Sequence, residues 1–194
     1  MQDFTFYLQL GFDHVMDPAA YDHVLFLSAL ALPFTFKSWK KVLLLATVFT
    51  IAHCLSLALS AYGLLSVDTA WIEFLIPVTI LLTALFDIVY LHKDADTMGV
   101  SLHVAATAFF GLVHGFGFSN YFNMLMAGTA EKGVPLLGFA TGIEGSQVVV
   151  ILVILGLAFL AQQVFQLKRR YFIVIGATIV ALTTIPMLID TFPK

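Results

Sequence analysis

The sequence has few charged residues and almost no cysteine. Only 11% of its 194 residues are Asp, Glu, Lys or Arg, against about 25% in a typical soluble domain. Hydrophobic residues make up 60%, and the mean hydropathy is +0.98. This composition excludes a soluble globular protein and predicts an integral membrane protein. The single cysteine, Cys54, excludes an internal disulfide and cysteine-rich metal motifs. Any bound metal must therefore be held mainly by histidine and carboxylate side chains.

Long basic runs and a secretory signal are also missing. The longest basic tract is Lys168-Arg169-Arg170 and the net charge is −3, so we expect no nucleic-acid partner. The first residues include an acid, Asp3, where a signal peptide would carry Lys or Arg, and no cleavage pattern follows a short apolar run. We therefore expect the N-terminal residues to belong to the mature protein.

The sequence does contain apolar segments of about 17–25 residues, the length that crosses a bilayer as a helix. Six segments qualify: residues 20–36, 39–62, 71–91, 101–118, 136–160 and 171–189. Their connections are short and polar, so we predict one all-α domain, residues 1–194, built as a bundle of six transmembrane helices. Two further stretches, 4–14 and 120–127, are weakly amphipathic and fit either an interfacial helix or a loop.

Lysine and arginine are unevenly distributed among the connections. Lys132 and Lys194 lie on one side of the predicted membrane, and the other seven lie on the opposite side: Lys37, Lys40, Lys41, Lys93, Lys168, Arg169 and Arg170. Because basic connections remain in the cytoplasm, both termini are predicted to be extracytoplasmic. The expected location is a cytoplasmic membrane of bacterial type, crossed several times.

Several ionisable side chains fall inside the predicted spans, where each costs at least ~2.5–3.5 kcal/mol at the helix centre. His53, His114 and Glu144 lie in the outer half, on helix faces that also carry polar or small residues. Asp22 and His23 open the first span and follow His14 closely. These groups have either a functional role or a structural one: Asp22 could cap a helix, and the others could form hydrogen bonds that only stabilise packing.

Two pairs of glycines, Gly111 with Gly115 and Gly138 with Gly142, have the spacing that allows helix backbones to approach closely. We expect this packing to bring His114 and Glu144 together. In the inner half, Asp87 and His103 are candidates for a polar route towards the cytoplasm.

Imidazole with carboxylate is a ligand set for a divalent transition metal. It suits zinc, nickel, cobalt, copper and iron, and the order of metal affinities does not select among them. The residues alone therefore predict a metal site in the outer half of the bundle and leave the identity of the ion open.

Five segments together resemble the HupE/UreJ family of hydrogenase- and urease-accessory membrane proteins. They are Gly11-Phe-Asp-His14 with Tyr21-Asp-His23-Val-Leu-Phe, Phe49-Thr-Ile-Ala-His53-Cys-Leu-Ser, Glu73-Phe-Leu-Ile, Phe110-Gly-Leu-Val-His114-Gly-Phe-Gly-Phe and Gly142-Ile-Glu144-Gly-Ser-Gln147. The resemblance implies a six-span protein that handles nickel, or cobalt, with metalloenzyme maturation proteins as partners. It implies functional roles for His14, Asp22, His23, His53, His114 and Glu144.

The sequence departs from the nickel permeases of this group at two points. Seven residues separate His14 from Asp22, a longer gap than in those permeases, and Cys54 stands where the pattern usually has serine. The chain is accordingly more similar to the broader branch of the family.

Three functions are compatible with these residues. The first is a permease that carries a divalent metal ion through the His and carboxylate site; no P-loop is present, so a gradient or a partner would supply the energy. The second is an intramembrane metal-dependent hydrolase of the zinc type, with Glu144 or Asp22 as general base. The third is a metal sensor or a docking subunit for a metallochaperone. A sparse polar route through the inner half favours the permease, so enzymatic activity is the less expected outcome.

Overall fold

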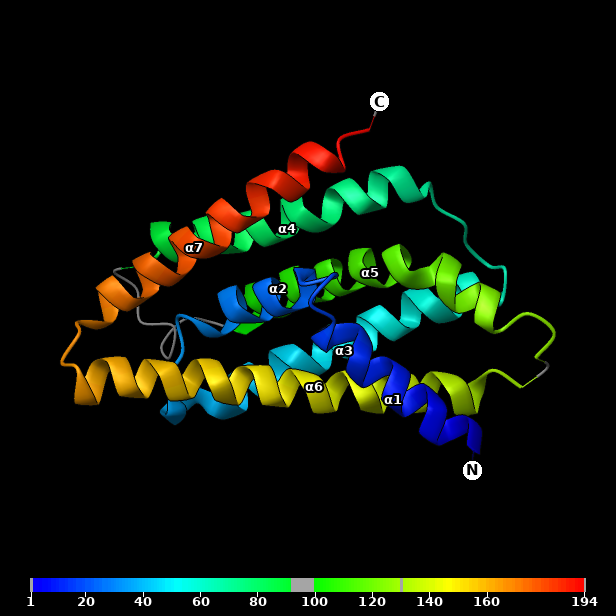
Figure 1. The fold of residues 1–194 in the computed structure, drawn as a ribbon, viewed down its shortest axis with the longest axis horizontal. Helices are drawn as coiled ribbons and strands as arrows, with labels where there is room; N and C mark the ends of the chain where they lie inside the picture. The colour runs from blue at the N-terminus through cyan, green and yellow to red at the C-terminus, as the bar shows by residue number, and fades with distance from the viewer. Residues whose placement is uncertain (1, 92–99, 130, 194) are drawn as a thin grey trace.

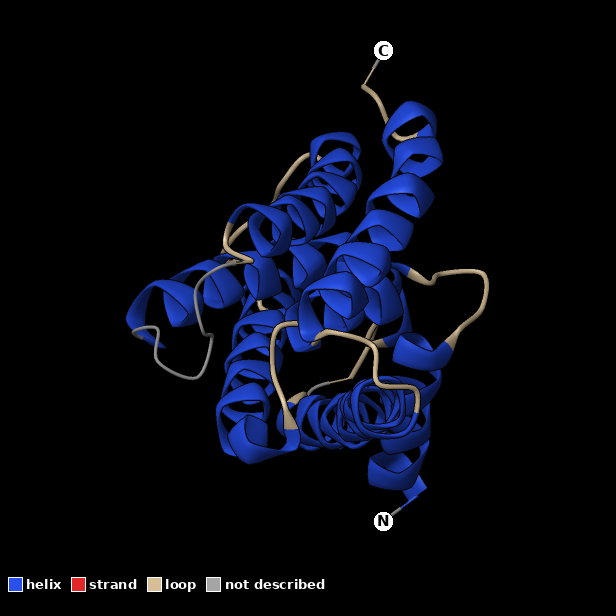
Figure 2. Cartoon of the chain, turned by 90° about the vertical axis from the view of Figure 1, so that its left-hand side faces the viewer, coloured by secondary structure: helices blue, strands red, loops and turns tan. Residues whose placement is uncertain are grey.

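The computed structural model describes residues 2–91, 100–129 and 131–193, and every regular element in these ranges is a helix (Figures 1 and 2). The helices are α1 (Gln2–Met16), α2 (Asp22–Ala31), the short 3-10 helix η1 (Phe36–Ser38), α3 (Trp39–Ala61), α4 (Thr69–Val89), α5 (Val100–Leu125), α6 (Gly133–Phe159), the π-helical turn η2 (Leu160–Val164) and α7 (Arg169–Asp190). The prediction of an all-α protein is confirmed.

Four helical stretches are long and apolar enough to cross a membrane: 36–61, 69–89, 133–164 and 169–190. Helix α5 has 26 residues, which at about 1.5 Å per residue is also longer than the ~30 Å hydrocarbon core. Large apolar side chains cover the outside of these helices; Ile51, Leu152 and Ile179 are each more than half exposed. Surfaces of this kind fit contact with lipid, and the chain is a multi-pass membrane protein.

The prediction of one continuous helix over residues 20–36 is wrong. Helix α2 has only ten residues and ends at Ala31, two positions before Pro33, whose nitrogen cannot donate a backbone hydrogen bond. The stretch 4–14 is neither a loop nor an isolated surface helix, because it belongs to the 15-residue helix α1, which packs along α6. The stretch 120–127 is largely the last part of α5, which continues to Leu125.

The bundle is elongated, and α1 and α2 follow one another along its long axis (Figure 1). Helix α1 runs from the N-terminus to the middle of the molecule, and α2 continues from there towards the end at which α6 finishes and α7 begins. The most extensive packing is between α3 and α5, between α1 and α6, and between α4 and α7. The break between α1 and α2 therefore lies midway along the bundle, and its residues 16–21 are exposed.

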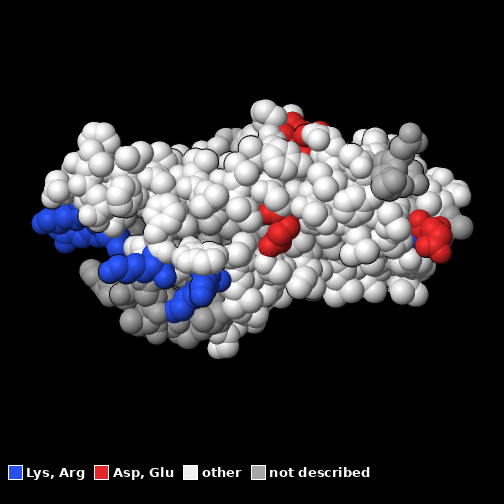
Figure 3. Space-filling model, turned by 90° about the horizontal axis from the view of Figure 1, so that it is seen from below, with Lys and Arg blue, Asp and Glu red and all other residues white. Residues whose placement is uncertain are grey.

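Lysine and arginine gather at one end of the long axis (Figure 3). We call this the basic end; its residues are Lys37, Lys40, Lys41, Lys168, Arg169 and Arg170, which surround the starts of α3 and α7. The connection 92–99, with Lys93, lies outside the described residues. The described cations thus have the arrangement on which the predicted orientation depends.

Candidate metal site

Glycines in α1 and α6 allow the two helices to touch backbone to backbone. A Cβ atom placed on Gly142 would lie 2.0 Å from the carbonyl oxygen of Leu8, and one on Gly11 would lie 2.2 Å from that of Phe139. Only hydrogen fits in these positions. This close contact holds the end of α1 against the bundle and places His14, in its last turn, in the interior.

A second glycine contact joins α3 and α5. A Cβ on Gly115 would lie 2.2 Å from the carbonyl oxygen of His53, and one on Gly111 would lie 2.6 Å from that of Phe49. The two glycine pairs therefore face different helices: one joins α5 to α3, and the other joins α6 to α1. The expectation that they bring His114 to Glu144 is wrong, because the α5 pair packs His114 against the helix of His53.

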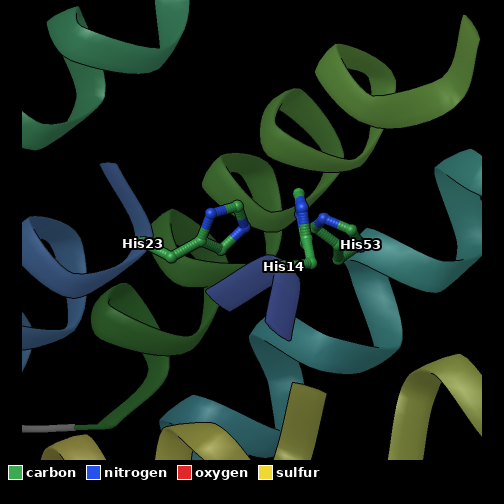
Figure 4. A group of neighbouring side chains, drawn as sticks. All are labelled: His14, His23 and His53. Atoms are coloured by element: carbon green, nitrogen blue, oxygen red, sulfur yellow. The ribbon is translucent and has the colours of Figure 1, made fainter. Parts of the chain in front are cut away.

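Three histidines from three helices meet where these contacts converge. The ligand nitrogens of His14, His23 and His53 all lie within 4.8 Å of one another, and Figure 4 shows the three imidazoles gathered around a common space. Two nitrogens that bind one ion at about 2.1 Å are at most about 4.2 Å apart. Small side-chain movements would therefore bring all three to a single ion.

Four of the imidazole nitrogens in this group have no hydrogen-bond partner among the described residues. Nε2 of His14, Nε2 of His23 and both ring nitrogens of His53 are buried, and none has a partner among the described residues. The side chain of His53 is fully buried. Because buried polar atoms are nearly always paired, such a group of unpaired nitrogens is typical of a site that binds an ion.

His114 brings a fourth imidazole to the edge of the group. Its ring centroid lies 5.3 Å from that of His23, and its Nε2 is buried and unpaired among the described residues. Its Nδ1 lies 2.8 Å from the carbonyl oxygen of Phe110. A carbonyl can only accept, so Nδ1 carries the hydrogen and Nε2 keeps the lone pair that a metal requires.

Asp22 orients His23 in a similar way. Oδ1 of Asp22 lies 3.2 Å from Nδ1 of His23, an arrangement in which the ring donates Nδ1–H to the carboxylate. A carboxylate behind a histidine fixes the ring and makes its other nitrogen a better ligand. Asp22 therefore supports His23 in the geometry described here, rather than belonging to the close group of nitrogens.

Glu144 lies in a different polar cluster, between α3 and α6. Its carboxylate accepts hydrogen bonds from Thr47 at 2.6 Å and Thr50 at 2.7 Å, and Gln147 donates to the Thr50 hydroxyl at 2.9 Å. The metal-ligand group found among the described residues consists of histidines alone. The structure thus does not bring Glu144 into that group.

A cavity of about 680 Å³ opens beside the histidines. His14, His23 and His114 line its inner wall, and Asp13, Asp17 and Glu73 line its outer part together with Asp22. Asp13, Asp17 and Glu73 were not among the site residues predicted from the sequence. The spacing of Asp13 and Asp17, four residues apart, was the only signal that they face the same side.

Three phenylalanines close the other side of the histidine group, and sequence reasoning missed them. The rings of Phe26 and Phe49 stack with centroids 4.8 Å apart, and Phe110 meets Phe26 at 6.0 Å. Phe49 lies 6.0 Å from His23 and 5.2 Å from His114. We call Phe26, Phe49 and Phe110 the aromatic barrier.

A second, narrower cavity of about 220 Å³ begins beyond the barrier. Phe26 and Phe110 form one wall, and Thr83, His103 and Thr107 supply its polar groups. Asp87 follows Thr83 by one helical turn. Its side chain is buried, and its Oδ2 has no hydrogen-bond partner among the described residues. Asp87 itself does not line this cavity.

The sequence profile of one family, described as "HupE / UreJ protein", matches residues 1–190. No curated protein and no solved structure matches the chain. The match covers nearly the whole chain, which therefore belongs to the HupE/UreJ family. This membership supports a role in handling nickel or a related metal, as an accessory or transport protein.

Proposed function

We propose that this member of the HupE/UreJ family is a permease that carries a divalent transition-metal ion, with nickel as the first candidate, across a cytoplasmic membrane. The observation that carries the proposal is the convergence of His14, His23 and His53 with unpaired, buried nitrogens. Neutral imidazole is a good ligand for nickel, cobalt, copper and zinc. His114 is the proposed fourth ligand, because its Nε2 is oriented by the carbonyl of Phe110.

The outer cavity is the proposed entrance. Carboxylates at Asp13, Asp17, Asp22 and Glu73 line it, and a cleft with charges of one sign raises the local concentration of ions of opposite sign. A hydrated cation that enters here would exchange water for the imidazoles of His14 and His23 at the inner wall. Nothing in this step requires a resident cofactor, since the metal ion is the cargo.

Helices α1 and α2 are the proposed first crossing, in two halves. Together they contain enough residues to span the hydrocarbon core at about 1.5 Å per residue. Transporters commonly place ion sites at such breaks in a membrane helix, where helix ends and side chains meet the substrate. Here His14 ends the first half, and Asp22 and His23 begin the second. With α3 to α7 this gives six crossings and extracytoplasmic termini.

The aromatic barrier separates the two cavities and is the proposed closed gate. Phe26 and Phe49 are fully buried, and a hydrated cation cannot pass between rings that touch. Transport would then require Phe26 or Phe110 to move, so that the ion leaves the histidines for the inner cavity. His103 and Thr107 would receive it there, and Asp87 would act further along the route.

A metal-dependent hydrolase is the alternative, and one observation favours it. Three histidines beside carboxylates, open to a 680 Å³ cavity, resemble the arrangement in which a metal ion activates water. The two functions differ in how long the ion stays: a carrier must release it, whereas a hydrolase retains it.

The test is nickel uptake by sealed vesicles that contain the purified protein. We expect uptake that saturates with nickel concentration and is abolished by His53→Ala, while Gly145→Ala vesicles keep it. No uptake above protein-free vesicles, together with near-stoichiometric metal that survives purification, would contradict the permease and favour the hydrolase.

A further inference from the structure

A third cavity, of about 590 Å³, lies at the basic end, and none of its lining residues is a histidine. It is formed by the segment that follows α2, by the end of α6 with η2, and by the start of α7. Its polar lining consists of Thr35, Lys37, Gln162, Gln163 and Arg169, and we call it the basic pocket. None of these residues takes part in the proposed metal route.

The polar lining is built to donate hydrogen bonds. The guanidinium of Arg169 donates an N–H hydrogen bond from Nη2 to the carbonyl oxygen of Pro33, which fixes the side chain at the pocket. Lys37 adds an exposed ammonium, and the two glutamines add amides. The hydroxyl oxygen of Thr35 is buried and has no partner among the described residues.

The charge of the pocket selects the sign of its ligand. Two cations line it, and no Asp or Glu does among the described residues. Helix α7 begins at Arg169, so the positive end of its dipole adds to the field. A metal ion would be repelled here, and an anion with several acceptor oxygens would be held.

The remaining wall of the pocket is apolar and faces outward. Phe36 is 44% exposed and Phe159 is 53% exposed, with ring centroids 6.3 Å apart, and Leu155 lies beside them. A free phosphate ion would gain nothing from contact with these apolar side chains. A ligand with an anionic head and hydrocarbon chains would use both parts, and basic pockets between membrane helices on the cytoplasmic side are known to bind acidic headgroups.

We propose that the basic pocket binds the phosphate of an anionic phospholipid, with its acyl chains against Phe36 and Phe159. The lipid would join the end of α6 to the start of α7 and to the segment after α2. This inference goes beyond the proposed permease and does not depend on it, because none of the histidines contributes.

The experiment measures lipid binding by native mass spectrometry of detergent-purified, delipidated full-length protein. The probes are dioleoyl phosphatidylglycerol and dioleoyl phosphatidylcholine. We expect one tightly bound phosphatidylglycerol and at least about tenfold weaker phosphatidylcholine. The variant Lys37→Gln/Arg169→Gln should weaken phosphatidylglycerol binding by about tenfold or more.

The matched control is Lys40→Gln/Arg170→Gln. It removes one lysine and one arginine from the same end, and neither residue lines the pocket, since Lys40 lies over the Trp39 ring and Arg170 bonds to Tyr171. We expect it to bind phosphatidylglycerol within about twofold of the unsubstituted protein. Equal losses in both double variants would overturn the proposal, because diffuse attraction to the basic end would then explain the binding.

Two further arms complete the test. If loss of the Arg169 bond to Pro33 disturbs folding, Lys37→Gln alone keeps that bond and should weaken binding about fivefold; an unchanged affinity in that variant would contradict the proposal. Inorganic phosphate at millimolar concentration should leave the bound lipid in place. Full displacement by phosphate would show that the pocket recognises the free ion, and would also overturn the lipid assignment.

Discussion

The imidazoles of His14 and His23 lie with ring centroids 4.5 Å apart although they belong to two separate helices. The chain leaves α1 after Met16 and re-enters a helix at Asp22. A continuous helix through this region would place residues nine apart roughly 13 Å from one another. The break in the first crossing is therefore what puts two imidazoles at one point, where His53 of α3 meets them.

Asp22→Asn tests whether the carboxylate behind His23 matters. Asparagine keeps the shape but accepts less strongly from Nδ1–H, so we expect nickel affinity to fall by about 10–100-fold with the stoichiometry unchanged. Isothermal titration of purified protein measures both quantities. Asp17→Asn is the control, because Asp17 lines the cavity without touching His23, and it should stay within about threefold. Equal affinities for the two variants would remove the proposed role of Asp22.

Acid should weaken metal binding steeply. Protons compete with the metal for each imidazole nitrogen. We expect nickel affinity to fall as the pH is lowered, and the dependence to become shallower in His114→Ala because one competing imidazole is gone. Affinity measured at several pH values in one buffer series checks this. A flat profile would argue against histidine ligands.

Gly142→Ala should disturb the metal site from a distance. Its Cβ would meet the carbonyl oxygen of Leu8 at 2.0 Å, so α1 must move, and the cost of such overpacking is typically about 1–3 kcal/mol. We expect a lower thermal midpoint and weaker nickel binding. Gly145→Ala is the matched control, because its nearest contact would be Phe12 at 4.0 Å. That variant should bind nickel normally; a site weakened equally by both changes would contradict the account.

Phe26→Ala tests the aromatic barrier through access to the inner cavity. In a Cys54→Ser background, a cysteine introduced by Thr107→Cys lies beyond the barrier, and a membrane-impermeant thiol reagent added outside should not reach it. Removing the Phe26 ring should increase the labelling rate at least about tenfold, at a stability cost of about 3–5 kcal/mol. Phe26→Leu provides a milder variant if folding is lost.

Two results of the labelling experiment would contradict the proposed role of the aromatic barrier. Fast external labelling of Thr107→Cys with Phe26 intact would show that the barrier does not separate the cavities. An unchanged rate after the ring is removed would place the barrier elsewhere. This readout does not involve metal, so it remains informative whatever the transported ion is.

The sequence was sufficient to predict the helical membrane fold, because long apolar segments with basic ends have few alternatives. It was not sufficient to find the break at residues 17–21. The apolar run around Leu27 continues past Pro33 and looks like one short span, whereas the stretch before His14 is polar enough to resemble a surface segment. Packing against α6, through glycine contacts at Gly11 and Gly142, decides its place.

The candidate site shows the same division. Intramembrane histidines at positions 53 and 114 were expected to be functional because burying them is costly. Which of them meet depends on which helices pack together, and helical spacing does not determine this. The glycine pair at 138 and 142 faces α1 rather than α5, so Glu144 binds Thr47 and Thr50 instead of joining the histidines. Nothing in the sequence predicted the aromatic barrier, because phenylalanine is common throughout membrane helices.

The most direct test of the metal site is the stoichiometry and affinity of nickel binding to purified protein, compared among the unsubstituted chain, His53→Ala and His103→Ala. The account predicts one nickel ion per chain, loss of at least about 100-fold in affinity for His53→Ala, and unchanged binding for His103→Ala, whose ring lines the inner cavity. Equal binding by all three proteins would contradict the account, because nickel would then be held somewhere other than the histidines at the break.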